Sequence, residues 1–187
     1  MDLKNLRTFV SIPVPNQIYK IQNHLVLENP NSSNLRLIDK NNIHLTLRFI
    51  GQTPQSSINK IKEGLDFIVN IFQPFQLNIQ GFGFFPNMDL PKVLWAGLSG
   101  EIDILSRLVI SINDRLRPLG FDNPDKEYTP HISLARSNNK ETISNISQIM
   151  KIDYDPIPFN VKKINFISSE LFPKGSVYTI LSTHFIS

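Results

Sequence analysis

A four-residue pattern, His-apolar-hydroxyl-Leu, occurs twice in this chain of 187 residues and constrains its fold more than any other feature. Residues 44–47 read His-Leu-Thr-Leu, and residues 131–134 read His-Ile-Ser-Leu. Each copy lies in a segment where apolar residues alternate at period two, which is typical of a half-buried strand. Because the copies lie in corresponding contexts in the two halves of the chain, they predict two similar lobes related by a pseudo-twofold axis.

Strands interrupted by single helices are predicted along the rest of the chain. Runs of this kind, with a hairpin connection at 173–175, favour an α+β fold: two similar lobes whose antiparallel sheets face a central groove, with helices on the outside. Residues 28–34 are expected to form a surface loop. Strands are predicted at 6–12, 35–38, 43–51, 75–82, 93–98, 131–136, 159–168 and 177–184, and helices at 16–27, 56–72, 102–116 and 141–150.

Composition limits the class of protein. The length suits one bilobal domain over residues 1–187, and 41% hydrophobic residues with 13 Phe are enough for a core. The absence of Cys excludes disulfides, thiol nucleophiles and iron–sulfur clusters, and it is compatible with a cytoplasmic protein. No apolar run reaches the roughly 18 residues of a membrane span, so we expect no membrane association, and we expect a monomer. Lys and Arg number 19 against 16 acidic residues, so any phosphate affinity must come from a local site.

The two motifs carry a set of groups suited to chemistry at phosphorus. On a strand, residues i and i+2 point to the same face, so His44 projects beside Thr46 and His131 beside Ser133. Two such strands facing each other across a groove supply two imidazoles, one as base and one as acid, and two hydroxyl donors for an oxyanion. This set can displace a group at phosphorus without a metal ion.

The competing interpretation is that each motif histidine is structural. One His-x-Thr on a strand is common by chance, and a single copy is therefore a weak signal. Two copies that use two of only four histidines, each followed by Leu, are far more specific. His24 and His184 lack this setting, and we expect them to be a helix-surface residue and a terminal-strand residue without catalytic roles.

The sequence resembles the 2H phosphoesterase superfamily, which has paired His-x-Thr/Ser motifs, and within it the RNA 2',3'-cyclic phosphodiesterases that are also described as 2'-5' RNA ligases. Segments 42–51 and 129–136 resemble the two motifs, and 7–12 resembles the opening strand. Segment 85–97 resembles the middle signature, and 169–178 the closing hairpin. The second motif has Ser where Thr is more usual, and Ser keeps the hydroxyl donor.

The resemblance implies a function and a set of roles. It implies a metal-independent and cofactor-independent enzyme that opens 2',3'-cyclic phosphate ends of RNA, or cyclic nucleotides, to 2'-phosphates, with reversible 2'-5' RNA ligation. His44 would be the acid and His131 the base, although the nearly identical motifs do not distinguish them. The implied phosphate-binding residues are Thr46, Ser133 and Arg136, and the implied nucleobase-stacking residue is Phe49.

Strict alternation conflicts with two of these roles. It places Phe49 and Arg136 on the strand faces opposite to His44 and His131. The resemblance favours a phosphate-binding role for Arg136, whereas the residues leave Phe49 open between core and nucleobase stacking. Trp95 and the aromatic residues at 82–85 are interpreted as core because they occur at strand spacing.

Other functional classes are weighed against this one. Residues 81–83 lack the third glycine of a dinucleotide loop, and neither a P-loop nor a Gly-x-Ser-x-Gly elbow is present. Asp122, Asp125 and Glu127 lie near the second motif and are interpreted as a solvated loop rather than a metal site. Two alternatives stay open: a non-catalytic RNA-end binding module, which the retention of both histidines argues against, and a phosphodiesterase for another cyclic phosphate, such as an ADP-ribose derivative.

Overall fold

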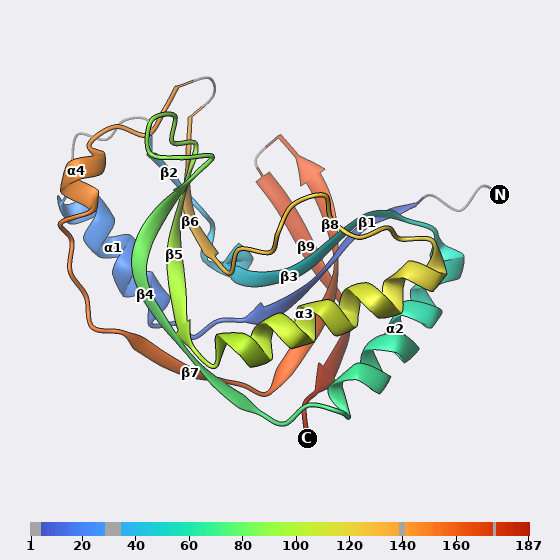
Figure 1. Cartoon of the computed structure of the whole chain (residues 1–187). Coiled ribbons are helices and arrows are strands. Elements are labelled where there is room, and N and C mark those ends of the chain that lie inside the picture. The colour runs from blue at the N-terminus through green and yellow to red at the C-terminus, as the bar shows by residue number, and fades with distance from the viewer. Residues whose placement is uncertain (1–4, 29–34, 139–140, 174) are drawn as a thin grey trace.

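The computed structural model describes residues 5–28, 35–138, 141–173 and 175–187 (Figure 1). Its strands are β1 (Leu6–Pro13), β2 (Leu35–Leu37), β3 (His44–Thr53), β4 (Phe75–Phe85), β5 (Val93–Gly100), β6 (Ile132–Ser137), β7 (Ile157–Val161), β8 (Lys163–Phe172) and β9 (Gly175–Phe185). Its α-helices are α1 (Ile18–Glu28), α2 (Gln55–Val69), α3 (Ile102–Leu116) and α4 (Ile146–Ile149), and the 3₁₀ turns are η1 (Lys40–Asn42) and η2 (Arg117–Leu119). Of the predicted loop at 28–34, only the last residue of α1 lies within the described residues.

In the described part of the chain, the strands form one curled antiparallel sheet with the order β7-β4-β5-β6-β3-β1-β8-β9, and β2 pairs with β6 beside this path. The order is symmetric about its centre, where the two motif strands β3 and β6 lie side by side. A single residue pair, Leu45 with Ile132, joins the two halves. The α+β fold with two similar halves is therefore confirmed, with the two predicted sheets joined at the motifs.

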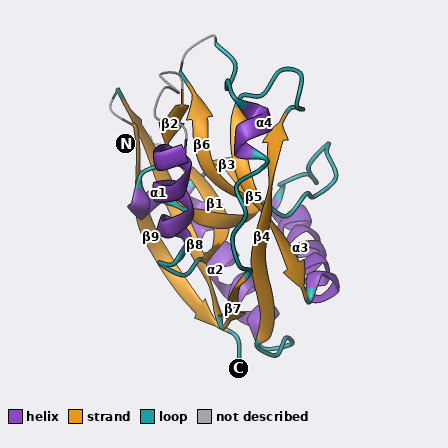
Figure 2. Cartoon of the chain, turned by 90° about the vertical axis from the view of Figure 1, so that its left-hand side faces the viewer, coloured by secondary structure: helices purple, strands orange, loops and turns teal. Residues whose placement is uncertain are grey.

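The helices cross between the halves of the sheet. Helix α1 follows β1 of one half but packs beside α4, and the amide of its buried Gln22 donates to the Leu134 carbonyl of β6 in the other half. Helix α3 follows β5 but packs against α2 and β3 of the opposite half (Figures 1 and 2). Each half therefore supplies a helix that covers the other.

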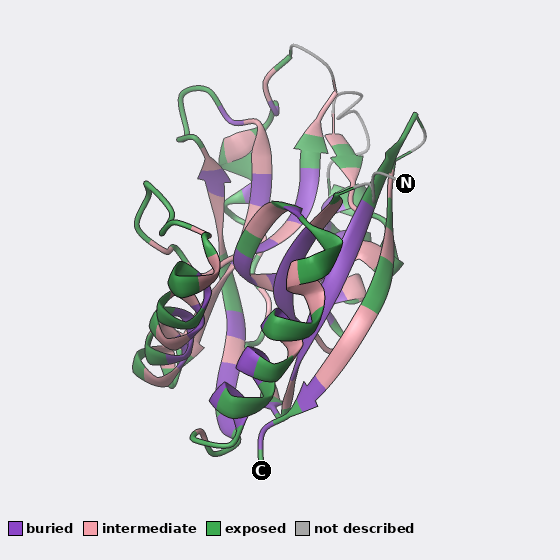
Figure 3. Cartoon of the chain, turned by 90° about the vertical axis from the view of Figure 1, so that its right-hand side faces the viewer, coloured by how far each residue is buried: buried purple, intermediate pink, exposed green. Residues whose placement is uncertain are grey.

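Helix α2 shows how the sequence pattern sets the packing. Its apolar residues recur at helical spacing, so Ile61, Leu65 and Ile68 are buried while the outward face of the helix is exposed (Figure 3). The buried face of α2 packs on α3 and β9. No helix within the described ranges is both long and apolar enough to cross a lipid bilayer.

A predicted helix and a predicted strand differ most from the structure in extent. The helix predicted at 141–150 is only the short α4, because the preceding Asn145 has a left-handed φ of 58° and the Ile143 amide donates to the Pro91 carbonyl instead. The strand predicted at 159–168 is interrupted at Lys162, where the chain leaves β4, the partner of β7, and joins β1, the partner of β8. Both differences depend on tertiary partners that periodicity does not encode.

Candidate active site

His44 is fixed at the start of β3 by hydrogen bonds to both ring nitrogens. Nδ1 lies 2.7 Å from the Asn42 carbonyl oxygen, and Nε2 lies 2.9 Å from Oγ1 of Thr46. Because a carbonyl only accepts, Nδ1 carries the proton of the neutral ring, and Nε2 accepts from the Thr46 hydroxyl. The Asn42 side chain donates to the Ser176 carbonyl at 2.8 Å, which ties this turn to the β8–β9 hairpin.

His131 repeats this arrangement just before β6. Its Nδ1 lies 2.7 Å from the carbonyl oxygen of Thr129, again two residues earlier in the chain. The neutral ring therefore also carries its proton on Nδ1 and leaves Nε2 for chemistry. Both motifs thus fix the same tautomer by the same local contact.

Aromatic side chains hold each imidazole. The His44 ring stacks on Phe9 of β1 with centroids 4.8 Å apart, and Tyr178 of β9 lies edge-on at 5.5 Å. The His131 ring meets Phe85 edge-on at 4.7 Å, and Trp95 lies at 6.1 Å. The interpretation of Phe85 and Trp95 as core is wrong, because both are half-buried and surround His131. Phe84, which directly precedes Phe85, is in the core.

Gly83 explains how Trp95 reaches its position. A Cβ atom at residue 83 would lie 2.1 Å from the Trp95 ring, so any side chain there would displace the indole. Trp95 in turn packs on Phe85, with ring centroids 5.3 Å apart. The glycine on β4 therefore supports His131 indirectly, through two aromatic rings.

The Leu45–Ile132 pair brings the two motifs together. Because β3 and β6 are antiparallel, His44 lies on the side of Ser133, and Thr46 on the side of His131. The Tyr128 hydroxyl also donates to the Thr46 carbonyl at 3.0 Å, which links the segment before the second motif to the first. Two imidazoles and two hydroxyls thus converge from opposite halves of the sheet.

The pKa values of both motif histidines are lowered, and the charge of one imidazole affects the pKa of the other. Burial lowers the pKa of His44, the hydrogen bond to Asn42 raises it, and the charge of His131 lowers it further. Burial also lowers the pKa of His131, the hydrogen bond to Thr129 raises it, and the charge of Arg136 lowers it. The neutral form of both rings is therefore favoured in the free protein, and a proton on one ring disfavours a proton on the other.

A bulge in each motif strand changes which side chains face the groove. Thr46 pairs with Ser11 and Arg48 with Val10, so Leu47 is an extra residue in β3. Leu134 is the corresponding extra residue in β6, where Ser133 pairs with Trp95 and Ala135 with Leu94. Each bulge reverses the alternation beyond it.

Phe49 and Arg136 occupy equivalent positions, five residues after His44 and His131, and both are exposed. The alternative that Phe49 is core is therefore wrong: its side chain is 49% exposed, and the Arg7 guanidinium carbon lies 4.7 Å from its ring centroid. The bulge at Leu134 likewise reverses the alternation before Arg136, and the Arg136 charge contributes to the lowered pKa of His131. The bulges resolve the conflict between alternation and resemblance.

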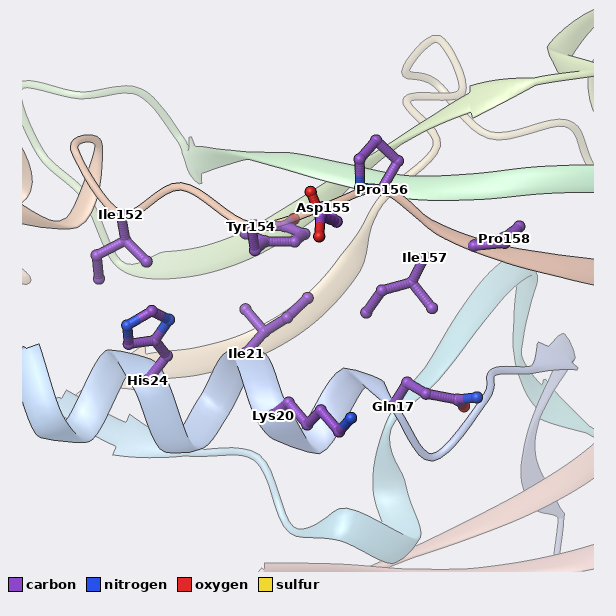
Figure 4. Close-up of a pocket in the computed structure, with 10 residues that line it drawn as sticks. All are labelled: Gln17, Lys20, Ile21, His24, Ile152, Tyr154, Asp155, Pro156, Ile157 and Pro158. Atoms are coloured by element: carbon purple, nitrogen blue, oxygen red, sulfur yellow. The ribbon is translucent and has the colours of Figure 1, made fainter.

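A cavity of about 1200 Å³ opens between β3 and the segment that leads to β6. Its lining combines Thr46, Phe49 and His131 with residues of α3. A smaller cavity of about 400 Å³ lies between α1 and residues 152–158 (Figure 4). It is lined by His24 and by neither motif, so the larger cavity is the candidate active site.

A family model described as the 2'-5' RNA ligase superfamily matches residues 15–171. The chain belongs to this superfamily. The protein named RNA 2',3'-cyclic phosphodiesterase from Archaeoglobus fulgidus is 30% identical over 176 residues, which cover 92% of this chain and 96% of that protein. The protein of the same name from Thermotoga maritima is 29% identical over 181 residues, with coverage of 94% and 93%.

Solved structures show the same superfamily fold. TT0787 of Thermus thermophilus has a TM-score of 0.80 at 23% identity, covering 97% of this chain and 98% of that one. Escherichia coli LigT complexed with 3'-AMP has a TM-score of 0.72 at 19% identity, covering 98% and 99%. These matches confirm the predicted resemblance over nearly the whole chain.

The two histidines outside the superfamily motifs lie where the sequence places them. His24 is exposed on α1, with Nε2 3.7 Å from the Glu28 carboxylate. His184 is buried in β9, with Nδ1 2.5 Å from Asp66 of α2 and Nε2 2.8 Å from the Ser182 hydroxyl. This Ser-His-Asp chain borders neither cavity and fastens α2 to β9.

The acidic residues near the second motif do not form a cluster with the histidines. Asp122, Asp125 and Glu127 are all exposed, as predicted for a solvated loop. No group of three His, Asp or Glu side chains suited to a metal ion occurs within the residues that the structure describes. Of these three acidic residues, Glu127 lines the cavity, together with Lys92 and Lys126.

Proposed function

We propose that this protein is an RNA 2',3'-cyclic phosphodiesterase that converts cyclic phosphate ends to 2'-phosphomonoesters by two-histidine acid–base catalysis. The observation that supports the proposal is the pairing of Leu45 with Ile132, which joins the two motif strands, together with the same Nδ1-to-carbonyl contact at each histidine. Membership of the superfamily and the names of its relatives support the substrate class.

The reaction needs one proton removed and one delivered. A neutral Nε2 takes a proton from water as the water oxygen attacks phosphorus, and the bond from phosphorus to the 3' oxygen breaks. The other imidazole, protonated on Nε2, gives its proton to the departing 3' oxygen. The product carries a 2'-phosphate and a free 3' hydroxyl. We assign the base to His131 and the acid to His44.

The remaining groups bind the substrate. Thr46 and Ser133 donate hydroxyl hydrogen bonds to the non-bridging oxygens as negative charge builds on them, and the Arg136 guanidinium supplies a fixed positive charge. The half-exposed Phe49 ring offers a stacking face for the terminal base. If the 5' hydroxyl of a second RNA replaces water, the same displacement forms a 2'-5' linkage, so reversible 2'-5' ligation is part of the proposal.

The test is ring opening in the presence of EDTA. An RNA that ends in a 2',3'-cyclic phosphate is incubated with the protein, and the product isomers are separated by chromatography; a 2'-phosphate is the expected product. A predominant 3'-phosphate would show the opposite substrate orientation, and activity that requires added zinc or magnesium would contradict the metal-free scheme. Binding of the RNA without ring opening would favour a binding module, and ring opening only of a cyclic phosphate derived from ADP-ribose would change the substrate class.

A further inference from the structure

The cavity extends well beyond the two motifs. Its volume of about 1200 Å³ exceeds the range of about 300–1000 Å³ that is typical for drug-sized ligands. Its lining includes Ser106, Ile110 and Asn113 of α3 as well as Thr46 and His131 of the motifs. We call the surface formed by the three α3 residues the α3 compartment; a cavity of this volume has room for more than a cyclic mononucleotide held at the motifs.

Arg48 brings a buried positive charge to the same cavity. It follows the bulge in β3, so its side chain turns away from the face of His44 and is only 7% exposed. Nη2 donates to the backbone carbonyl of Asp122, and Nε has no hydrogen-bond partner among the described residues. No ion pair joins Arg48 to a carboxylate within the described ranges.

A buried cation without a counter-charge is costly, and burial accordingly lowers the pKa of Arg48. An anion in the cavity would compensate for this cost. In the proposed mechanism, the cyclic phosphate itself is bound by Thr46, Ser133 and Arg136. Arg48 is therefore available for a second anionic group, and an RNA end carries one that a cyclic mononucleotide lacks: the phosphodiester that joins its last two nucleotides.

The α3 compartment offers complementary groups for the adjoining nucleoside. Ile110 gives an exposed apolar surface, and the buried Oδ1 of Asn113 has no hydrogen-bond donor within the described part of the chain. A nucleobase presents both an apolar face and N–H donors on its edge. The compartment therefore has the chemistry of a nucleoside site.

We propose that the α3 compartment binds the penultimate nucleotide of an RNA, with Arg48 facing the last internucleotide phosphate. The inference rests on the proposed function, because it takes the cyclic phosphate to lie at the motifs. Under this proposal, the protein is selective for RNA ends over cyclic mononucleotides. Arg48, a residue outside the acid–base machinery, provides that selectivity.

The test compares a dinucleotide ending in a 2',3'-cyclic phosphate with the matching cyclic mononucleotide. Wild-type protein should have a higher kcat/KM for the dinucleotide. Arg48→Gln should lower kcat/KM for the dinucleotide by about 10–100-fold, the range for a hydrogen bond to a charged group, and leave the mononucleotide value unchanged. Arg48→Lys should restore part of the loss. Equal losses on both substrates, or no loss on the dinucleotide, would overturn the proposal.

A second variant covers the case in which Arg48→Gln does not fold. Ile110→Glu places a negative charge in the compartment from a position that is 58% exposed, and it should lower kcat/KM for the dinucleotide alone. The matched control is Ile71→Glu, the same change at a position that is 63% exposed and outside the cavity, which should affect neither substrate. A dinucleotide loss that Ile71→Glu reproduces would contradict the proposal.

A binding measurement distinguishes failure of this inference from failure of the proposed function. A dinucleotide and a mononucleotide that both end in a 2'-phosphate are titrated into wild-type protein and the Arg48→Gln variant. The variant should bind the dinucleotide about tenfold or more weakly and the mononucleotide unchanged. If the wild-type protein opens no cyclic phosphate but shows this difference, the proposed function fails and the site at Arg48 stands. If ring opening occurs without this difference, the inference fails alone.

Discussion

The two halves of the active site share a backbone plan but differ in their surroundings. In each half, Nδ1 of the histidine donates to the carbonyl two residues earlier, and an extra Leu makes a bulge three residues later. Around His44, a hydroxyl contacts Nε2, and Tyr178 of β9 lies edge-on to the ring. His131 instead borders the large cavity and lies near a guanidinium charge. The repeat therefore sets the positions of the two imidazoles, and the non-repeated neighbours set their chemistry.

The largest expected effect is the loss of either motif imidazole. His44→Ala and His131→Ala should each lower kcat for ring opening by about 10²–10⁴-fold, the usual contribution of a general acid or base. Chromatographic assays of cyclic phosphate cleavage measure the loss directly. Near wild-type turnover in either variant would show that the two halves do not share the proton transfers.

The remaining histidines are internal controls for this comparison. His24→Ala changes an exposed helix position and should leave kcat unchanged. His184→Ala removes a buried ring that is hydrogen-bonded to Asp66 and Ser182, so it should lower the thermal midpoint but not kcat in the folded protein. A kcat loss in His184→Ala comparable to that in the motif variants would contradict the assignment of catalysis to the motifs.

Arg136 allows the acid and base to be distinguished. Because burial lowers both histidine pKa values below 6.5, the bell-shaped profile of kcat/KM against pH should peak on the acid side of that value. Arg136→Gln should lower kcat/KM by about 10–100-fold through lost phosphate contacts, and it should also raise the pKa of His131 by removing a nearby positive charge.

The direction of the pH shift identifies the role of His131. A base must be deprotonated, so raising its pKa moves the ascending limb of the profile to higher pH and leaves the descending limb in place. An acid must be protonated, so raising its pKa would move the descending limb instead. We expect the ascending limb to move in Arg136→Gln. Movement of the descending limb would exchange the roles of the two halves.

The sequence predicts the repeated part of the site and misses most of what surrounds it. His44 and His131 are found because a duplicated pattern on two strands is improbable by chance. The bulges at Leu47 and Leu134 are not visible in a pattern of apolar residues, because Leu suits either face of a strand. Without the bulges, strict alternation places Phe49 on the face opposite to His44 and Arg48 on the same face as His44.

The aromatic supports are missed for a different reason. Phe9 and Tyr178 contact His44 from β1 and β9. These contacts depend on the order of the strands in the sheet, which the pattern of apolar residues does not give. Phe85 and Trp95 likewise read as core because their partners are set by β4–β5 pairing. Gly83 is the sequence feature that indicates one of these contacts, because a glycine within an aromatic strand can mark a close approach of another group.

The smallest expected effect tests whether His131 depends on that glycine. Gly83→Ala places a methyl group where the Trp95 ring lies, so the indole and the Phe85 ring against it must shift. The hydrogen bond from Nδ1 to Thr129 remains, so His131 should be loosened rather than lost, and kcat should fall by about threefold to tenfold. Trp95 is the only tryptophan, so a changed fluorescence spectrum would report its displacement. Gly64→Ala on α2 is the matched control, because the atoms nearest to its methyl group belong to the flexible Arg115 side chain, and it should change neither the spectrum nor kcat. If Gly83→Ala shifts the fluorescence but leaves kcat unchanged, the aromatic support is not needed for catalysis, and the histidines in both halves are positioned by their backbone contacts alone.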